Sequence, residues 1–281
     1  MPELAYLTLT PDVRLHHRID DWTDPWTNPE SIVLIHGFAE RTEAWRAWVP
    51  LLGRRLRVIR YDQPGFGRSS PVRGISDFST EGFVAAAAAV IEQLAGGRAH
   101  VVGAKSGGLI AIEVARRRPE LVLTLTLAST PLEAPKPDQW LAHMEAHGLR
   151  SWAKETMAPR LGSAMPPAGG RWRVNLMGRT SIETARAYMR WVSNLDIAAT
   201  LHEVRCPALV LTTSAPRRAY SRSDADVYRE RLPHAQLVAL PGDGYHVAAS
   251  YPEACVNALT GFLAQQKVSG ANGAAAIPLR Q

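Results

Sequence analysis

The chain has 281 residues, of which 46% are hydrophobic and 21% are charged, the composition of an ordinary soluble globular protein. Its net charge of +6 is compatible with solubility alone or with the attraction of anions, and no basic run is interleaved with aromatic residues, so we expect no nucleic-acid binding. No apolar run approaches the roughly 18 residues of a membrane span, and the N-terminus lacks a basic-then-apolar leader. Cys206 and Cys255 are the only cysteines, which favours a reducing, cytoplasmic setting without disulfides.

The first residues predict a β-hairpin, since Leu4–Thr10 and Val13–Ile19 alternate in polarity around a turn at Pro11-Asp12. Ser31–His36 is nearly continuously apolar, which is typical of a strand buried on both faces of a mostly parallel sheet. Similar strands are predicted at Leu56–Tyr61, Ala99–Gly103, Leu121–Ala128, Pro207–Thr213 and Gln236–Leu240. Helical patterns lie between or after them at Glu43–Leu52, Thr80–Leu94, Gly107–Arg118, Asp224–Leu232 and Pro252–Gln265. This alternation predicts an α/β fold with a doubly wound, mostly parallel sheet.

The alternation stops over residues 132–201, which have helical periodicity but no strand signal. Four of the eight tryptophans fall there: Trp140, Trp152, Trp172 and Trp191. We expect this segment to form a helical cap over the carboxyl edge of the sheet, where ligands bind in such folds. Residues 1–131 and 202–267 then form the core, and residues 268–281, which have little to bury, form a flexible tail.

A lysine stands where a catalytic nucleophile is expected. The segment from His100 to Ala111 reads as a strand, a turn of small residues and a helix, and Gly103 and Gly107 bracket Lys105 at the spacing of a nucleophile elbow. The same letters also fit a pattern with Ser106 as an ordinary nucleophile. We favour the lysine register because Gly103 ends the apolar strand two residues earlier.

A phosphate-binding loop is excluded at this turn, although its usual Lys-Ser ending is present. Both glycines that such a loop requires are replaced by alanine, at Ala99 and Ala104.

Three more loops follow predicted strands and carry chemistry-bearing residues. They are His36-Gly37-Phe38, Asp62-Gln63-Pro64-Gly65-Phe66-Gly67, and Gly242-Asp243-Gly244-Tyr245-His246. With the elbow, this ordered set resembles the α/β-hydrolase superfamily over residues 13–265. The resemblance implies an α/β-hydrolase fold, antiparallel at its first strands, with a cap like that of small enol-lactonases and carbon–carbon bond hydrolases. It also implies catalysis without a metal or organic cofactor.

The resemblance assigns roles to several residues. His246, after the last strand, is the candidate general base, and the backbone N–H groups of Phe38 and Ser106 are candidates for the oxyanion hole. His36, Arg217 and Trp152 are candidates for substrate contact, although His36 could instead only brace the oxyanion loop.

The acid of a catalytic triad is missing from its usual place. Residues 214–218, after the strand Pro207–Thr213, contain no carboxylate. The resemblance implies Glu133 as the candidate acid, because some family members supply their acid just beyond the sixth strand. Asp224, which could belong to the following helix, and Asp243, which could only stabilise its turn, are the alternatives.

Lys105 would lie at a helix N-terminus beneath the cap, and both the dipole and desolvation favour a neutral amine there. A neutral amine could form a Schiff base or accept a proton, whereas a charged one could anchor a carboxylate. Arginines are frequent in and around the cap, at Arg150, Arg160, Arg171, Arg173, Arg179, Arg186 and Arg190, and Arg217 and Arg218 follow a strand. One or two of them facing inward would suit an anionic substrate.

The sequence thus predicts an atypical hydrolase or lyase that acts on a small, carboxylate-bearing carbonyl or ester compound. Lys105, Ser106, His246 and Glu133 are its candidate catalytic residues. Two alternatives remain: a conventional serine ester or lactone hydrolase that uses Ser106, and a catalytically silent, receptor-like binding protein. We expect neither a membrane nor a nucleic acid as partner, and the sequence does not predict the oligomeric state.

Overall fold

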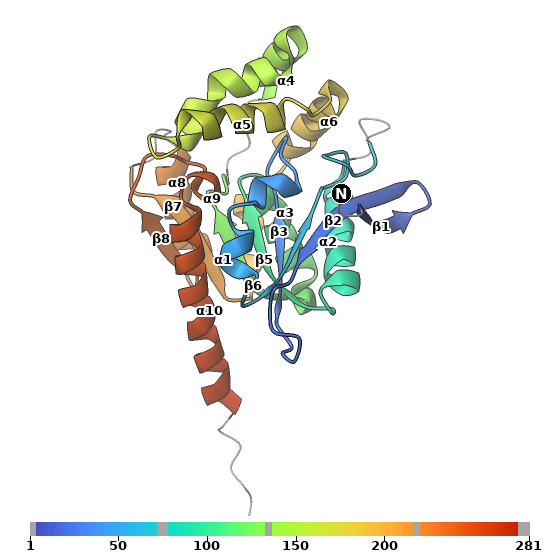
Figure 1. Ribbon diagram of the computed structural model, residues 1–281. Helices are drawn as coiled ribbons and strands as arrows, with labels where there is room; N and C mark the ends of the chain where they lie inside the picture. The colour runs from blue at the N-terminus through green and yellow to red at the C-terminus, as the bar shows by residue number, and fades with distance from the viewer. Residues whose placement is uncertain (1–3, 72–77, 133–136, 216–219, 275–281) are drawn as a thin grey trace, which may run out of the picture.

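The computed structural model describes residues 4–71, 78–132, 137–215 and 220–274 (Figure 1). Its eight described strands form one sheet in the order β1-β2-β4-β3-β5-β6-β7-β8. Their bounds are β1 Ala5–Thr10, β2 Val13–Asp20, β3 Ser31–Ile35, β4 Arg57–Tyr61, β5 Ala99–Ala104, β6 Val122–Ala128, β7 Ala208–Thr213 and β8 Gln236–Leu240. β2 pairs antiparallel with β1 and β4, and every other pair is parallel. The predicted fold class is confirmed.

Apolar side chains bury both faces of the central strands, as their continuous apolar runs predict. Along β3, Val33 and Ile35 point to one face and belong to a core with α2 (Thr80–Leu94) and α3 (Gly107–Arg117). Ile32 and Leu34 point to the other face and pack with α1 (Val49–Leu52) and α10 (Pro252–Ala274). The central strands are therefore covered on both faces.

The expected helix over residues 43–52 is two short elements, η1 (Thr42–Trp45) and α1. Pro50 lies in the first turn of α1, where its missing N–H does no harm, but it could not continue a helix from η1. At the other end of the chain, α10 reaches Ala274, so the first part of the predicted tail is helical. Residues 275–281 of that tail lie outside the described residues.

The segment predicted to be a cap is helical and lies above the carboxyl ends of the central strands (Figure 1). It contains α4 (Pro137–Leu161), α5 (Pro167–Met177), α6 (Ile182–Ser193) and α7 (Ile197–Thr200). Gly148, with φ 78° and ψ 159°, interrupts α4 and divides it into two helical pieces. We call α4–α6 the upper helices.

Hydrogen bonds tie the upper helices to the sheet domain. The indole of Trp191 in α6 donates to Thr80 at the start of α2 over 3.1 Å, and the hydroxyl of Thr184 donates to the carbonyl of Gly65 over 3.1 Å. The remaining described elements are η3 (Pro119–Leu121), η4 (Leu201–Glu203), α8 (Tyr220–Arg231) and α9 (Val247–Ser250).

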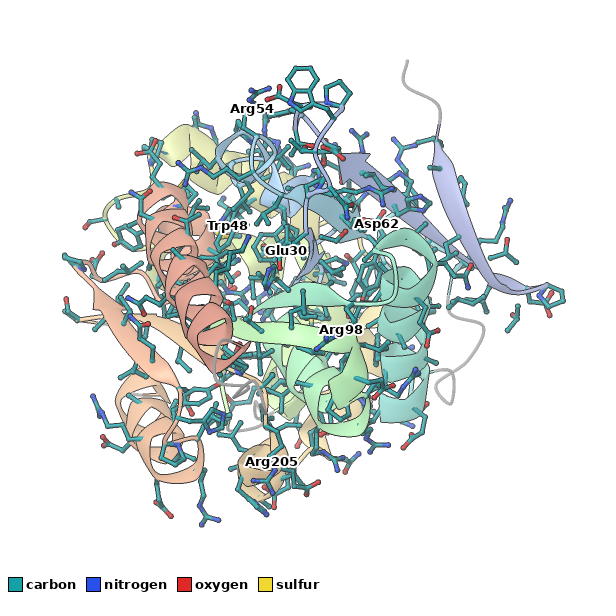
Figure 2. All side chains as sticks on the ribbon, turned by 90° about the horizontal axis from the view of Figure 1, so that it is seen from below. Glu30, Trp48, Arg54, Asp62, Arg98 and Arg205 are labelled. Atoms are coloured by element: carbon teal, nitrogen blue, oxygen red, sulfur yellow. The ribbon has the colours of Figure 1, made fainter. Side chains whose placement is uncertain are left out.

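The opposite edge of the sheet is seen from below in Figure 2. Glu30 and Arg98 lie there, directly before β3 and β5. Glu30 forms an ion pair of 2.6 Å with Lys267, which fastens α10 to this edge. None of the helices that the structure describes combines the length and the apolar character of a membrane span.

Candidate active site

Lys105 occupies the turn between β5 and α3 with a φ of +55°, a conformation that is strained for any residue with a side chain. Its backbone N–H donates to the carbonyl of Ala128 at the end of β6, over 3.0 Å. Small residues are needed around this turn because a Cβ at Gly107 would collide with the backbone carbonyl oxygens of Ile35 and His36. The first turn of α3 thereby packs directly against the end of β3.

The ammonium group of Lys105 lies over the ring of Tyr245, with Nζ 3.4 Å from the ring centroid. The negative face of an aromatic ring attracts a cation, so this contact favours the charged form of the lysine. It therefore opposes the neutral amine that the helix dipole alone would favour. Tyr245 directly precedes His246, so the lysine side chain lies beside the candidate base.

Ser106 is the N-cap of α3, and its hydroxyl points to the loop after β3. Its Oγ accepts a hydrogen bond of 3.0 Å from the N–H of Phe38. Burial raises the pKa of the Tyr188 hydroxyl, and the neighbouring side chain of Ser106 partly opposes this effect. The Ser106 hydroxyl thus takes the hydrogen bond of the Phe38 N–H, which is one of the two N–H groups expected to form an oxyanion hole.

His246 follows β8 and begins α9, and its backbone N–H donates to the carbonyl of Arg160 over 2.8 Å. Its Nε2 lies 3.0 Å from Oε1 of Glu40, whereas its Nδ1 is buried and has no hydrogen-bond partner among the described residues. An ionised carboxylate is only an acceptor, so Nε2 carries the ring proton and Nδ1 the lone pair.

Glu40 is the central carboxylate of the site. Its Oε1 accepts 2.7 Å from Nη1 of Arg173 in α5, and its Oε2 accepts 3.3 Å from the N–H of Gly37. Burial raises the pKa of Glu40, but the hydrogen bond from His246 and the charge of Arg173 outweigh burial and hold that pKa well below its usual range. Glu40 is therefore ionised at neutral pH.

The same burial acts on His246 in the opposite sense. It lowers the pKa of the imidazole, and Arg173 and Lys105 lower it further, whereas Glu40 raises it. The net shift is downward, so His246 is neutral near pH 7. A neutral imidazole is the form that accepts a proton.

The acids expected from the sequence have other surroundings. Glu133 lies outside the described residues. Asp224 is buried in α8 and accepts 3.1 Å from the N–H of Leu132. Asp243 accepts from the N–H and hydroxyl of Ser163, which fastens the upper helices to the loop after β8. Sequence reasoning missed Glu40, whose only signal was a carboxylate two residues after His36-Gly37-Phe38.

The three residues predicted to contact substrate differ in position. Trp152 lines the pocket from α4. His36 is fully buried behind the pocket wall, where Nδ1 donates 2.8 Å to the carbonyl of Gly37 and Nε2 accepts 3.0 Å from the N–H of Gln63. These bonds brace the loop after β3, and His36 is not among the residues that line the pocket, so its contact with substrate stays a prediction. Arg217 lies outside the described residues.

A pocket opens between the carboxyl edge of the sheet and the upper helices, and its walls are mainly apolar. Its apolar side chains include Phe38, Leu109, Trp140, Trp152, Met157, Met177, Tyr188, Met189, Val192, Val210, Leu211 and Leu237. Its ionisable side chains include Glu40, Lys105, Arg160, Arg173, Asp224 and His246. Within the described part of the chain, no group of three or more His, Cys, Asp or Glu residues is placed to hold a metal ion.

Arg160 is a second cation of this pocket. Its side chain is buried, and its guanidinium stacks on Trp152 at 4.2 Å from the ring centroid. Its Nη1 lies 3.7 Å from the sulfur of Met177. With Arg173 it is one of two buried arginines that reach the pocket from the upper helices.

An antiparallel start, a parallel remainder, a strained strand-to-helix turn and a histidine after the last strand are together the arrangement of the α/β-hydrolase fold. Residues 30–160 match a family model described as the alpha/beta hydrolase fold. A pimeloyl-[acyl-carrier protein] methyl ester esterase of Sodalis glossinidius is 30% identical over 217 residues, covering 74% of this chain and 76% of that protein. The chain belongs to the α/β-hydrolase superfamily.

Other relatives agree with this assignment. The esterase of the same name from Nitrosomonas europaea is 29% identical over 259 residues, covering 83% of this chain and 96% of that protein. Among solved structures, an enol-lactonase from Burkholderia xenovorans has a TM-score of 0.82 at 21% identity, covering 92% of this chain and all (100%) of its own. A thermophilic esterase from Thermogutta terrifontis has a TM-score of 0.81 at 21% identity, covering 94% and 99%. These structures share the fold.

Proposed function

We propose that this protein hydrolyses small esters or lactones that carry a carboxylate, with His246 as general base and with Lys105 in the position of the usual serine nucleophile. One observation carries the proposal: Nε2 of His246 bonds to Glu40 and not to a serine, while the Ser106 hydroxyl is held by the N–H of Phe38. A serine held in this way is not activated for attack. The named relatives, an enol-lactonase and methyl ester esterases, support the ester or lactone class.

In this mechanism a water molecule attacks the carbonyl carbon and gives one proton to Nδ1 of His246. A buried acceptor without a partner is rare, and Nδ1 is such an acceptor among the described residues. The N–H of Ser106 at the start of α3 and the ammonium of Lys105 stabilise the negative charge that develops on the carbonyl oxygen. When the tetrahedral intermediate collapses, the leaving alkoxide takes this proton from His246. An ester then releases an acid and an alcohol, and a lactone opens to one hydroxy acid.

The preference for a carboxylate rests on the cations Lys105 and Arg160. The pocket also holds Arg173, which is paired with Glu40, and Asp224, and its other walls are mainly apolar. We interpret the upper helices as a cap that keeps water away from these cations. A desolvated, charge-assisted hydrogen bond contributes about 1.5–3 kcal/mol, which selects acids over neutral analogues by roughly tens-fold.

The reaction class is tested by screening p-nitrophenyl esters, enol-lactones and β-diketo acids with wild type, Lys105→Ala, Ser106→Ala and His246→Ala. We expect turnover to be lost in the lysine and histidine variants and retained in Ser106→Ala. His234→Ala, which removes an exposed histidine, is the matched control. A fluorophosphonate probe should leave no adduct on the protein.

Each other outcome points to a different function. A fluorophosphonate adduct on Ser106, with loss of activity in Ser106→Ala, would identify a conventional serine hydrolase. Cleavage of β-diketo acids alone would identify a carbon–carbon bond enzyme. Ligand binding without turnover in any variant would identify a receptor.

Selection for a carboxylate is tested by calorimetric titration with a free acid and its methyl ester. Wild type should bind the acid tens-fold more tightly, and Arg160→Gln should lose most of this difference. Arg186→Gln, at a partly exposed surface ion pair with Glu145, should retain it. Equal affinities for acid and ester in wild type would exclude the anionic substrate.

A further inference from the structure

Three elements far apart in the sequence meet at one carboxylate. Glu40 follows β3, Arg173 comes from α5 and His246 follows β8, and the side chains of Arg173 and Glu40 are only 8% and 5% exposed. We propose that Glu40 is a positioning residue that sets the tautomer and the basicity of His246 in the role of a triad acid, and that Arg173 holds it there. This inference rests on the proposed function only for its kinetic readout.

The geometry differs from the arrangement that a triad requires. In a Ser-His-Asp triad the acid bonds Nδ1 and leaves Nε2 to face the nucleophile. Here the carboxylate bonds Nε2, and Nδ1 has no hydrogen-bond partner among the described residues. The nitrogen that can accept a proton is therefore Nδ1 here, whereas it is Nε2 in a Ser-His-Asp triad. Ser214 and Ala215, which follow β7 where the usual acid would stand, carry no charge.

A structural ion pair between Arg173 and Glu40 would not need a histidine. Oε1 of Glu40 nevertheless accepts from both Arg173 at 2.7 Å and His246 at 3.0 Å, and Oε2 is oriented by the N–H of Gly37. Arg173 is held in turn by the carbonyl of Ala44 at 3.3 Å. The carboxylate is thus fixed from both sides with one oxygen aimed at the imidazole.

The charged groups facing His246 act in opposite directions. Glu40, from the loop after β3, favours the protonated imidazole, whereas Arg173 of α5 and Lys105 of the β5–α3 turn oppose it. Tyr245 precedes His246 in the chain, and Arg160 of α4 contacts it through a backbone carbonyl. Removing Glu40 and removing Arg173 should therefore move the titration of His246 in opposite senses, which a general loosening of the site would not do.

The test is a pH titration of the ¹⁵N-labelled imidazoles by NMR in wild type, Glu40→Gln and Arg173→Gln. The His246 signal is identified by its loss in His246→Ala. In wild type we expect a neutral ring with the proton on Nε2. Glu40→Gln should move its titration down by about one pH unit or more, and Arg173→Gln should move it up by a similar amount.

Glu43→Gln, three residues further along the chain in η1 and outside the site, is the matched control, and the exposed His234 is the internal reference. If Glu40→Gln does not fold, Glu40→Asp takes its place. This variant keeps the charge, so His246 should titrate in it as in wild type. With a substrate in hand, Glu40→Gln should lower kcat at least about ten-fold, leave KM within about two-fold and shift the acidic limb of the pH profile with the NMR titration.

A neutral ring protonated on Nδ1, or shifts of the same sign in both variants, would overturn the inference. So would a His246 titration in Glu40→Gln that matches wild type. Because the NMR titration needs no substrate, it decides the role of Glu40 even if no hydrolysis is found. Failure of the proposed function would then appear separately, in the substrate screen.

Discussion

Removal of Arg173 from its buried ion pair should destabilise the protein strongly. The pair spans 2.7 Å between side chains that are 8% and 5% exposed, so Arg173→Met leaves the Glu40 charge buried with a neutral histidine as its remaining side-chain partner. Removal of one partner from such a pair costs about 3–5 kcal/mol, whereas replacement of both is close to neutral. Arg173→Met combined with Glu40→Gln should therefore recover most of the loss.

The loss converts into a shift of the melting temperature. The entropy of unfolding is about 2.1 cal/mol/K per residue, or roughly 0.6 kcal/mol/K for 281 residues, so a loss of 3–5 kcal/mol lowers Tm by about 5–8 °C. Calorimetry and urea unfolding of the two single variants and the double variant measure the coupling energy, which should exceed about 2 kcal/mol.

A surface pair provides the matched control for this cycle. Arg186 and Glu145 are 35% and 41% exposed, and Arg186→Met should cost less than about 1 kcal/mol. A stability loss for Arg173→Met no larger than that for Arg186→Met would contradict this prediction. So would losses for the Glu40 and Arg173 single variants that add without coupling.

Two further predictions concern pH and backbone packing. Burial lowers the pKa of His36 and His246, so the folded state binds fewer protons than the unfolded chain below about pH 6.5, and thermal midpoints should fall steadily from pH 7.5 to pH 5; an unchanged midpoint would contradict this. Gly107→Ala should lower the free energy of unfolding by more than about 4 kcal/mol or prevent folding, because the new Cβ meets the backbone carbonyls of Ile35 and His36. Gly261→Ala, in open space on α10, should raise it by up to about 1 kcal/mol. Chemical unfolding measures both.

The sheet could be predicted from the sequence because its signals are local. Each buried strand is a short apolar run, and the predicted and observed bounds of α2, Thr80–Leu94, agree at both ends. The strained turn at Lys105 was also visible, since the glycines that it needs lie within a few residues of it. The break in α4 was not predicted, because Gly148 could have been tolerated inside a continuous helix.

The carboxylate of the site could not be predicted in the same way. Glu40 meets Arg173 across 133 positions and His246 across 206 positions of the chain. No local pattern contains such a contact, and the family resemblance places the acid in other loops. Only the folded structure shows that the turn after Phe38 places the side chain of Glu40 beside His246.

The turn at Lys105, which the sequence predicts to be a nucleophile elbow, joins β5 to α3 through a residue of positive φ. A positive φ costs a residue with a side chain about 1–2 kcal/mol, and the packing of Gly107 against β3 maintains it. The strained turn directs the side chain of residue 105 to the pocket, whatever the chemistry of that side chain. Here it places the ammonium of Lys105 over the ring of Tyr245. The neighbouring His246 is neutral, and its Nε2 is bonded to the carboxylate of Glu40. The fold thus fixes the position of the residue 105 side chain. The residues around His246 determine whether that side chain acts as a nucleophile or only binds the substrate through its charge.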